Sequence, residues 1–141
     1  MALSSDERQQ FLAEPRIATI AVARDSTSPP LAVPIWYQYT PGGRPWILTG
    51  AGSVKDRAIA RAGSFTLAVE TLEPSVRYVS VEGRAVRRAP GTTEMLREMA
   101  ARYLPAEILD GYVEMSLAEH GDQVRIELEP TRWYSADLGA F

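Results

Sequence analysis

The chain has 141 residues, 45% of them hydrophobic and 23% charged, with a net charge of −3 at pH 7. This length suffices for one domain over residues 1–141 and is too short for two. The acidic balance argues against nucleic acid and acidic membrane surfaces as partners. No apolar run reaches the roughly 20 residues of a membrane-spanning helix, and the polar N-terminus differs from a signal peptide.

Cysteine and histidine usage narrows the possible chemistry further. The chain has no cysteine and one histidine, His120, so thiolate catalysis and multi-histidine metal sites are excluded within one chain. The lack of disulfides favours a reducing, cytoplasmic setting. His120 precedes Gly121, where helices commonly end, so an interaction with the last helical carbonyls is favoured over a catalytic base. We expect no metal.

The first part of the chain is expected to form one short helix followed by strands. A capping box and the apolar pair Phe11 and Leu12 predict a helix over residues 4–13. Apolar, β-branched residues predict a buried strand over Arg16–Arg24. A second strand is expected over Leu31–Tyr39, where proline at position 34 indicates a sheet edge or a bulge. A turn then leads into a third strand, Trp46–Thr49.

The most informative segment is Leu48–Arg57, with the sequence LTGAGSVKDR. It is typical of a strand end, a glycine turn and a helix start. Gly50 and Gly52 allow a sharp turn and the close approach of a ligand to the backbone. Ser53, followed three residues later by Asp56, fits a capping box that opens a helix.

This helix start brings free N–H groups together with the positive end of the helix dipole. Lys55 and Arg57 add two full positive charges beside Ser53. The combination is suited to an anion, above all a phosphate. A capped surface helix with two solvated cations explains the same residues about equally well, since such helices are common.

The rest of the chain continues this mixture of strands and helices. Following the helix over residues 53–62, with Gly63 as its C-cap, alternating apolar residues predict strands over 64–71, 76–88 and 123–130. Amphipathic patterns predict helices over 92–104 and, more weakly, 106–119. In the last strand, residues 124, 126 and 128 are expected to face inward and Arg125, Glu127 and Glu129 outward.

Six strands in mostly antiparallel succession, with short helices between them, predict a mainly β, α+β fold that closes or nearly closes into a barrel. The chain resembles the split β-barrel flavin and deazaflavin oxidoreductases, the superfamily that includes pyridoxamine 5′-phosphate oxidase. The resemblance runs from about Phe11 to Leu138 and rests on FLAEPRIATIAVAR, VPIWY, TGAGSVKDRAIAR and RYVSVEGRAV. The closing RWYSADL is most similar to the actinobacterial branch that uses the deazaflavin coenzyme F420. The expected fold is therefore a six-stranded antiparallel split β-barrel, similar to FMN-binding proteins.

The resemblance also implies a cofactor site. It assigns phosphate binding to the segment Gly52–Arg57, ring contacts to the second strand and its backbone, and hydroxyl contacts near the ribityl chain to two side chains. It further implies a homodimer in which the second subunit completes each site. The implied cofactor-binding residues are Val33, Pro34, Ile35, Trp36, Thr49, Gly52, Ser53, Lys55, Arg57, Tyr78 and Ser80. For Trp36, packing in the core and exposure to a ligand or a partner subunit remain about equally open.

These features imply an oxidoreductase that uses reduced F420 to pass hydride to an unsaturated or quinone-like small molecule. An FMN-dependent enzyme of the same fold is the first alternative, and a non-catalytic cofactor- or haem-binding module is the second. Because no second basic cluster accompanies Lys55 and Arg57, pyridoxamine phosphate oxidation itself is not expected. No catalytic acid or base is assigned, because the cofactor carries the redox chemistry.

Overall fold

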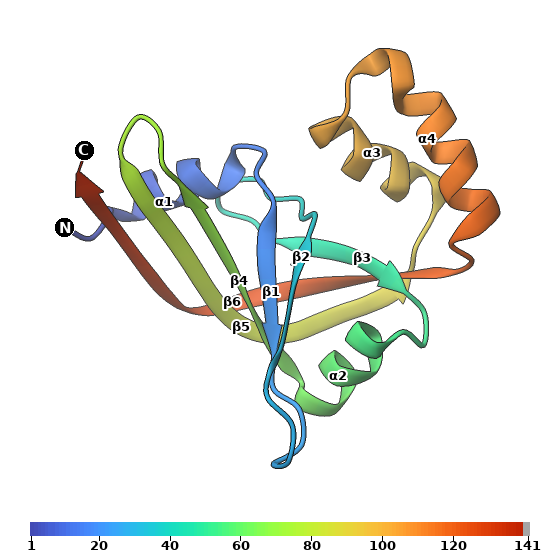
Figure 1. Cartoon of the computed structure of the whole chain (residues 1–141), viewed down its shortest axis with the longest axis horizontal. Helices are drawn as coiled ribbons and strands as arrows, with labels where there is room; N and C mark the ends of the chain where they lie inside the picture. Colours follow the sequence, from blue (N-terminus) through green and yellow to red (C-terminus); the bar gives the residue numbers. More distant parts are fainter. Residues whose placement is uncertain (140–141) are drawn as a thin grey trace.

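The computed structural model describes residues 1–139 as six antiparallel strands curled into a half-barrel, with four helices around it (Figure 1). The strand order is β2-β1-β4-β5-β6-β3, which confirms the predicted α+β split barrel. The strands are β1 (Ala18–Val22), β2 (Leu31–Ile35), β3 (Trp46–Gly50), β4 (Ser64–Thr71), β5 (Val76–Pro90) and β6 (Gln123–Gly139). The helices are α1 (Ser5–Ala13), α2 (Val54–Ala62), α3 (Thr93–Tyr103) and α4 (Ala106–Glu119).

Local capping groups set several of these boundaries. The Ser4 hydroxyl accepts the Glu7 N–H at 3.1 Å, and the Glu7 carboxylate accepts the Ser4 N–H at 3.0 Å. This is the predicted capping box of α1. Gly63 ends α2 in a left-handed conformation with φ of 71°, as expected for a helix C-cap. These ends depend on neighbours in sequence, so they could be predicted correctly.

The long strands β5 and β6 bend across the molecule and shape the barrel (Figure 1). Their register shifts between Glu82 and Gly83. A Cβ at Gly83 would overlap the carbonyl oxygen of Glu129, so only glycine permits this close approach of the two backbones. The edge strands β2 and β3 are not neighbours in the sheet. Within residues 1–139 a single isolated bridge, between Gln38 and Trp46, joins the two sides.

The core fills the inside of the curled sheet and extends under α1. Tyr37, Phe11 and Leu12 are fully buried, and they join inward-facing residues of every strand except β2, whose Val33 and Ile35 are only partly buried. In β5, Val79 is buried while Tyr78 is exposed. This alternation confirms the predicted inner and outer faces of the strand.

Three details of the sheet differ from the prediction. Strand β2 ends at Ile35 rather than Tyr39, because the Tyr103 hydroxyl of α3 accepts the Tyr37 backbone N–H at 3.1 Å. Strand β6 continues past Pro130 along β5 to Gly139. Glu127 alternates with the inward-facing Ile126 and Leu128, as predicted, but it is buried rather than exposed to solvent.

Glu127 is buried because two arginines compensate its charge. Arg125 lies 3.0 Å from one carboxylate oxygen and Arg44 lies 3.5 Å from the other. Arg125 also lies over the ring of Trp46 at 4.5 Å. A buried carboxylate requires such partners; Arg125 lies on the same strand, whereas Arg44 comes from a segment 83 residues away in sequence.

The α3–α4 hairpin lies beyond the open side of the barrel, at the upper right of Figure 1. Arg102 of α3 anchors it, since its guanidinium donates to the carbonyl oxygens of Leu12, Ala13 and Glu14 at 3.1, 2.9 and 3.0 Å. The same guanidinium lies over the Tyr37 ring at 4.7 Å. One side chain therefore joins the hairpin to the end of α1. Among residues 1–139, no helix combines the length and apolar character that crossing a bilayer requires.

Candidate functional site

The candidate site lies where β3 passes into α2. Thr49 is buried near the end of β3, and its hydroxyl lies 3.3 Å from the Ser53 hydroxyl. Ser53 is the N-cap of α2 and accepts the Asp56 N–H at 3.2 Å. Gly52 adopts φ of 75°, a conformation that favours glycine. The predicted turn and N-cap are therefore present.

The predicted capping box is wrong in one respect. The Asp56 carboxylate accepts the N–H of Gly52 at 2.7 Å rather than that of Ser53. Asp56 is only 3% exposed, and its other carboxylate oxygen forms an ion pair with Arg88 of β5. The tight turn brings the Gly52 N–H closer to Asp56 than sequence spacing suggests, because the left-handed glycine reverses the chain direction.

Two backbone donors remain available at this helix start. Among residues 1–139, no protein group accepts a hydrogen bond from the Val54 or Lys55 N–H. Lys55 is half-buried and is the only lysine in the sequence. Two free amide N–H groups and an ammonium group can together donate hydrogen bonds to the oxygens of a phosphate. The residues present therefore fit a phosphate.

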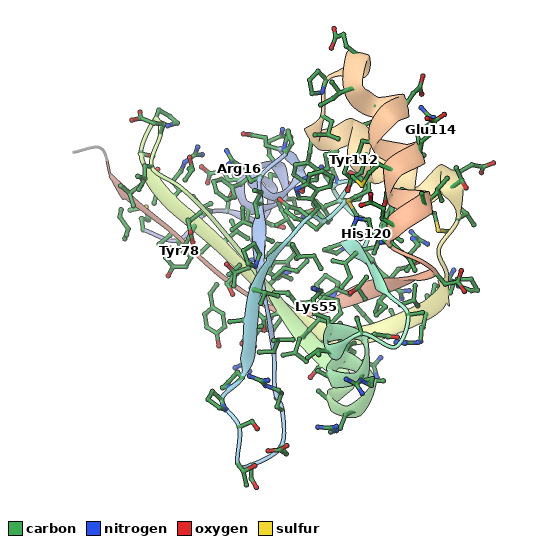
Figure 2. All side chains as sticks on the ribbon, turned by 45° about the vertical axis from the view of Figure 1, so that its right-hand side comes forward. Arg16, Lys55, Tyr78, Tyr112, Glu114 and His120 are labelled. Atoms are coloured by element: carbon green, nitrogen blue, oxygen red, sulfur yellow. The ribbon has the colours of Figure 1, made fainter. Side chains whose placement is uncertain are left out.

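Three cations of α2 are free to meet a negatively charged ligand. No carboxylate described in residues 1–139 lies within ion-pair distance of Lys55, Arg57 or Arg61. Arg57 and Arg61 are exposed. Figure 2 shows Lys55 projecting from α2 toward the middle of the molecule.

The expected ring-lining segment forms an edge of the sheet. Among the described residues 1–139, strand β2 pairs only with β1, so alternate backbone groups on its outer side have no strand partner there. Val33 and Ile35 are half-buried against the core, and Pro34 is exposed. The predicted sheet edge at Pro34 is confirmed.

Trp36 follows β2 and is held by aromatic neighbours from the helical hairpin. Its ring stacks on Tyr103 at 4.8 Å with an interplanar angle of 14°. Tyr112 of α4 lies 5.6 Å away in a tilted orientation, and Figure 2 shows Tyr112 on the side of α4 that faces the barrel. Protein contacts thus account for part of the Trp36 surface.

Tyr78 and Ser80 lie apart from the α2 start in the same chain. Both belong to the outer face of β5. In Figure 2, Tyr78 lies to the left of the central strands, away from Lys55 beside α2. One chain therefore does not bring together all the residues that the resemblance implies. His120 is the C-cap of α4, at the predicted end of the helix, and its backbone N–H donates to the Ser116 carbonyl oxygen at 2.9 Å; an interaction of its imidazole with the last helical carbonyls stays a prediction.

Arg88 is a residue of this region that the sequence pattern missed. The β5–β6 register shifts between Val86 and Ala89, and Arg87 adopts φ of 49° there. This bulge directs Arg88 onto Asp56. A hollow of about 580 Å³ opens beside the pair, lined also by Asp122 and Gln123. The sequence of two adjacent arginines in a predicted strand does not indicate that one of them pairs with Asp56, because this contact depends on the bulge.

Within residues 1–139, no group of three or more histidine, cysteine, aspartate or glutamate side chains could hold a metal ion.

Comparisons with known proteins give the fold. No family model and no curated protein matches the chain. The conserved hypothetical protein Rv2991 of Mycobacterium tuberculosis matches with a TM-score of 0.73 and 23% identity, over 97% of this chain and 86% of that one. An F420 reductase matches with 0.71 and 20%, over 89% and 94%. An FAD-binding protein of Mesorhizobium loti matches with 0.65 and 16%, over 96% and 95%.

These likenesses show the class of fold. The chain has the split β-barrel fold of pyridoxamine 5′-phosphate oxidase-like proteins, a fold that flavin-type oxidoreductases share. At these identities the likeness concerns the fold alone, so the cofactor and the reaction must be argued from the site.

Proposed function

We propose that the protein is an oxidoreductase that binds reduced F420 and transfers hydride to an unsaturated or quinone-like small molecule. The observation that carries this proposal is the start of α2. There, the unpaired Val54 and Lys55 amides meet the half-buried ammonium of Lys55. The fold shared with an F420 reductase supports the cofactor class.

The residues of the chain would divide the binding of the cofactor among them. Lys55 and the two amides would hold the phosphate, with Gly52 leaving the backbone accessible. The Thr49 and Ser53 hydroxyls lie next to this point and would contact the ribityl chain. The outer backbone edge of β2, at Val33–Ile35, would line the ring.

Bound F420 would supply the hydride, and the protein would supply position and shielding. Holding donor and acceptor in contact accounts for a large part of the rate gain in such transfers. The half-buried β2 edge and the packed Trp36 would help to exclude water from the bound ring. The proposal requires no protein acid or base.

The charge distribution on α2 favours F420 over FMN. F420 continues beyond its phosphate into a lactyl and polyglutamate tail, which requires positive charge beyond the phosphate site. Arg57 and Arg61 are exposed and without ion-pair partners among residues 1–139. FMN has no such tail, and an FMN-dependent enzyme remains the second candidate, supported by the likeness to an FAD-binding protein.

The outer face of the central strands supports the homodimer that the resemblance implies. Small residues and tyrosines align there across three strands: Ala68 pairs with Ser80, which pairs with Tyr134, and Tyr78 pairs with Ala136. Tyr78 and Tyr134 are 39% and 46% exposed. Large exposed aromatic side chains over small residues are typical of protein interfaces. A second copy on this face would bring its Tyr78 and Ser80 toward a neighbouring site.

The dimer has its own test. Light scattering coupled to gel filtration should give twice the mass of the chain, and Ala68→Glu, which introduces a charge at the centre of this face, should give the monomer. Glu119→Ala, at the exposed end of α4, is the control and should leave the mass unchanged. A monomeric wild-type protein at tens of micromolar would contradict the dimer.

The cofactor is tested by titrating the purified protein with F420 and following F420 fluorescence. We expect a saturable change at micromolar concentrations, followed by oxidation of reduced F420 when a quinone is added. Saturable binding without turnover of any acceptor would instead indicate a non-catalytic carrier. A yellow protein with flavin absorption bands would favour FMN. If neither F420 nor FMN binds, the proposal is wrong.

A further inference from the structure

The start of α2 contains an electrostatic conflict. Its free amides and Lys55 attract an anion, but the Asp56 carboxylate contacts the Gly52 N–H at the same end of the helix. Asp56 is 3% exposed, so water screens its charge poorly. Without a cationic partner, this carboxylate would repel a phosphate and would offset part of the positive potential at the helix start.

Arg88 resolves this conflict. Its guanidinium forms an ion pair with the Asp56 carboxylate oxygen that the Gly52 N–H does not contact. The pair is neutral overall, so Lys55 and the helix dipole determine the net field at the Val54 and Lys55 amides. Arg88 is 44% exposed on its side chain while Asp56 is nearly enclosed, so the arginine reaches inward from the surface to the buried charge.

An irregularity in the backbone of β5 directs the Arg88 side chain toward Asp56. Regular pairing with β6 is interrupted between Val86 and Ala89, and Arg87 takes a left-handed φ of 49°. An extra residue in a strand re-aims the side chains next to it. Without the bulge, strand alternation would not turn Arg88 toward α2. A hollow bounded by Ala89 and Gly91 among others lies beside the pair.

We infer that Arg88 is a positioning residue for cofactor binding: by neutralising Asp56, it keeps the start of α2 selective for a phosphate-bearing ligand. This inference rests on the proposed function and names a part of the site that neither the sequence pattern nor the resemblance assigns. Arg88 acts through Asp56 and does not itself contact the phosphate. Asp56 in turn holds the Gly52 turn, which explains why a carboxylate stands at an anion site.

The test compares four proteins: wild type, Arg88→Gln, Asp56→Asn, and the double variant. Dissociation constants are measured for F420 and for its phosphate-free deazariboflavin core; FMN and riboflavin form the same pair if the protein binds flavin. Arg88→Gln should weaken F420 binding by on the order of tenfold and leave core binding unchanged. The double variant, in which asparagine can still accept the Gly52 N–H without a charge, should recover near wild-type affinity. Asp56→Asn alone should bind F420 more tightly than wild type.

Each alternative has a distinct result. If Arg88 contacted the phosphate directly, the double variant would stay as weak as Arg88→Gln, and the inference would be overturned. If Arg88 merely held the fold, affinity for the phosphate-free core would fall equally, which also overturns it. If Arg88→Gln fails to fold, Asp56→Asn decides: equal or weaker F420 binding than wild type overturns the inference. Wild-type protein that binds neither F420 nor FMN refutes the proposed function, whereas unchanged affinity in Arg88→Gln refutes only the role of Arg88.

Discussion

Replacing the only lysine of the chain tests the phosphate site most economically. In Lys55→Ala, one charge-assisted contact to the phosphate is lost while the amides remain. Such a contact contributes about 1–3 kcal/mol, which corresponds to a dissociation constant roughly 5- to 150-fold higher. Lys55 makes no ion pair with a carboxylate of residues 1–139, and alanine is a good helix former. We therefore expect the free energy of unfolding to change by less than about 0.5 kcal/mol.

The assay is F420 fluorescence titration, with urea unfolding measured on the same samples. Arg97→Ala is the matched control, since it also removes one positive charge but lies on α3 in an exposed pair with Asp110. Its F420 affinity should equal that of wild type. An unchanged dissociation constant in Lys55→Ala would refute the reasoning, because the phosphate would then lie elsewhere. An equal loss in Arg97→Ala would attribute the effect to net charge.

Three further predictions concern the scaffold that positions the site. Arg102→Leu removes donors from the carbonyls of residues 12–14 and should lower the free energy of unfolding by about 2–4 kcal/mol in urea; a loss below about 1 kcal/mol would contradict this anchoring role. Burial raises the pKa of Tyr37 from 10.0 to about 12, so its stabilising contribution is complete below pH 10 and lost as the pH rises toward 12; Tyr37→Phe, measured by chemical unfolding across that range, should lack this component of the decline. Gly83→Ala should lower the free energy of unfolding by about 3 kcal/mol or prevent folding. Gly111→Ala in α4, whose added Cβ meets no atom within 4 Å, should instead raise it by about 0.5–1 kcal/mol. Equal effects of the two substitutions would refute the close approach of the backbones at Gly83.

The features that could be predicted from sequence depend on near neighbours. The α1 capping box needs only Ser4 and Glu7, and the end of α2 needs only Gly63. Strand β4 alternates strictly, and its observed bounds match the expectation. The class of fold followed from the order of such elements together with the resemblance.

The features that could not be predicted from the sequence depend on contacts between residues far apart along the chain. Strand β2 ends early because the Tyr103 hydroxyl accepts a hydrogen bond from the Tyr37 backbone N–H, and these residues are 66 positions apart in sequence. Glu127 is buried because Arg44 reaches it from the turn before β3.

The candidate site shows the same division. Ser53 and the glycine turn followed from local spacing, whereas the hydrogen bond from Gly52 to Asp56 and the pairing with Arg88 did not. Whether Tyr78 and Ser80 complete the site depends on a second subunit, which no pattern within one chain can place.

The central claim, that the phosphate of the cofactor binds at Lys55, can be tested on a single resonance. Reductive methylation with ¹³C-formaldehyde labels only the Lys55 side chain and the terminal amine of Met1, and dimethylation keeps the charge of the lysine. The Met1 amine hydrogen-bonds to the Asp137 carbonyl oxygen; the N-terminus lies at the left end of the molecule, away from α2 (Figure 1), so this amine serves as an internal reference. Saturating F420 should shift the Lys55 methyl signal and leave that of Met1 in place. A protein that binds F420 by fluorescence while the Lys55 signal stays unmoved would contradict the account.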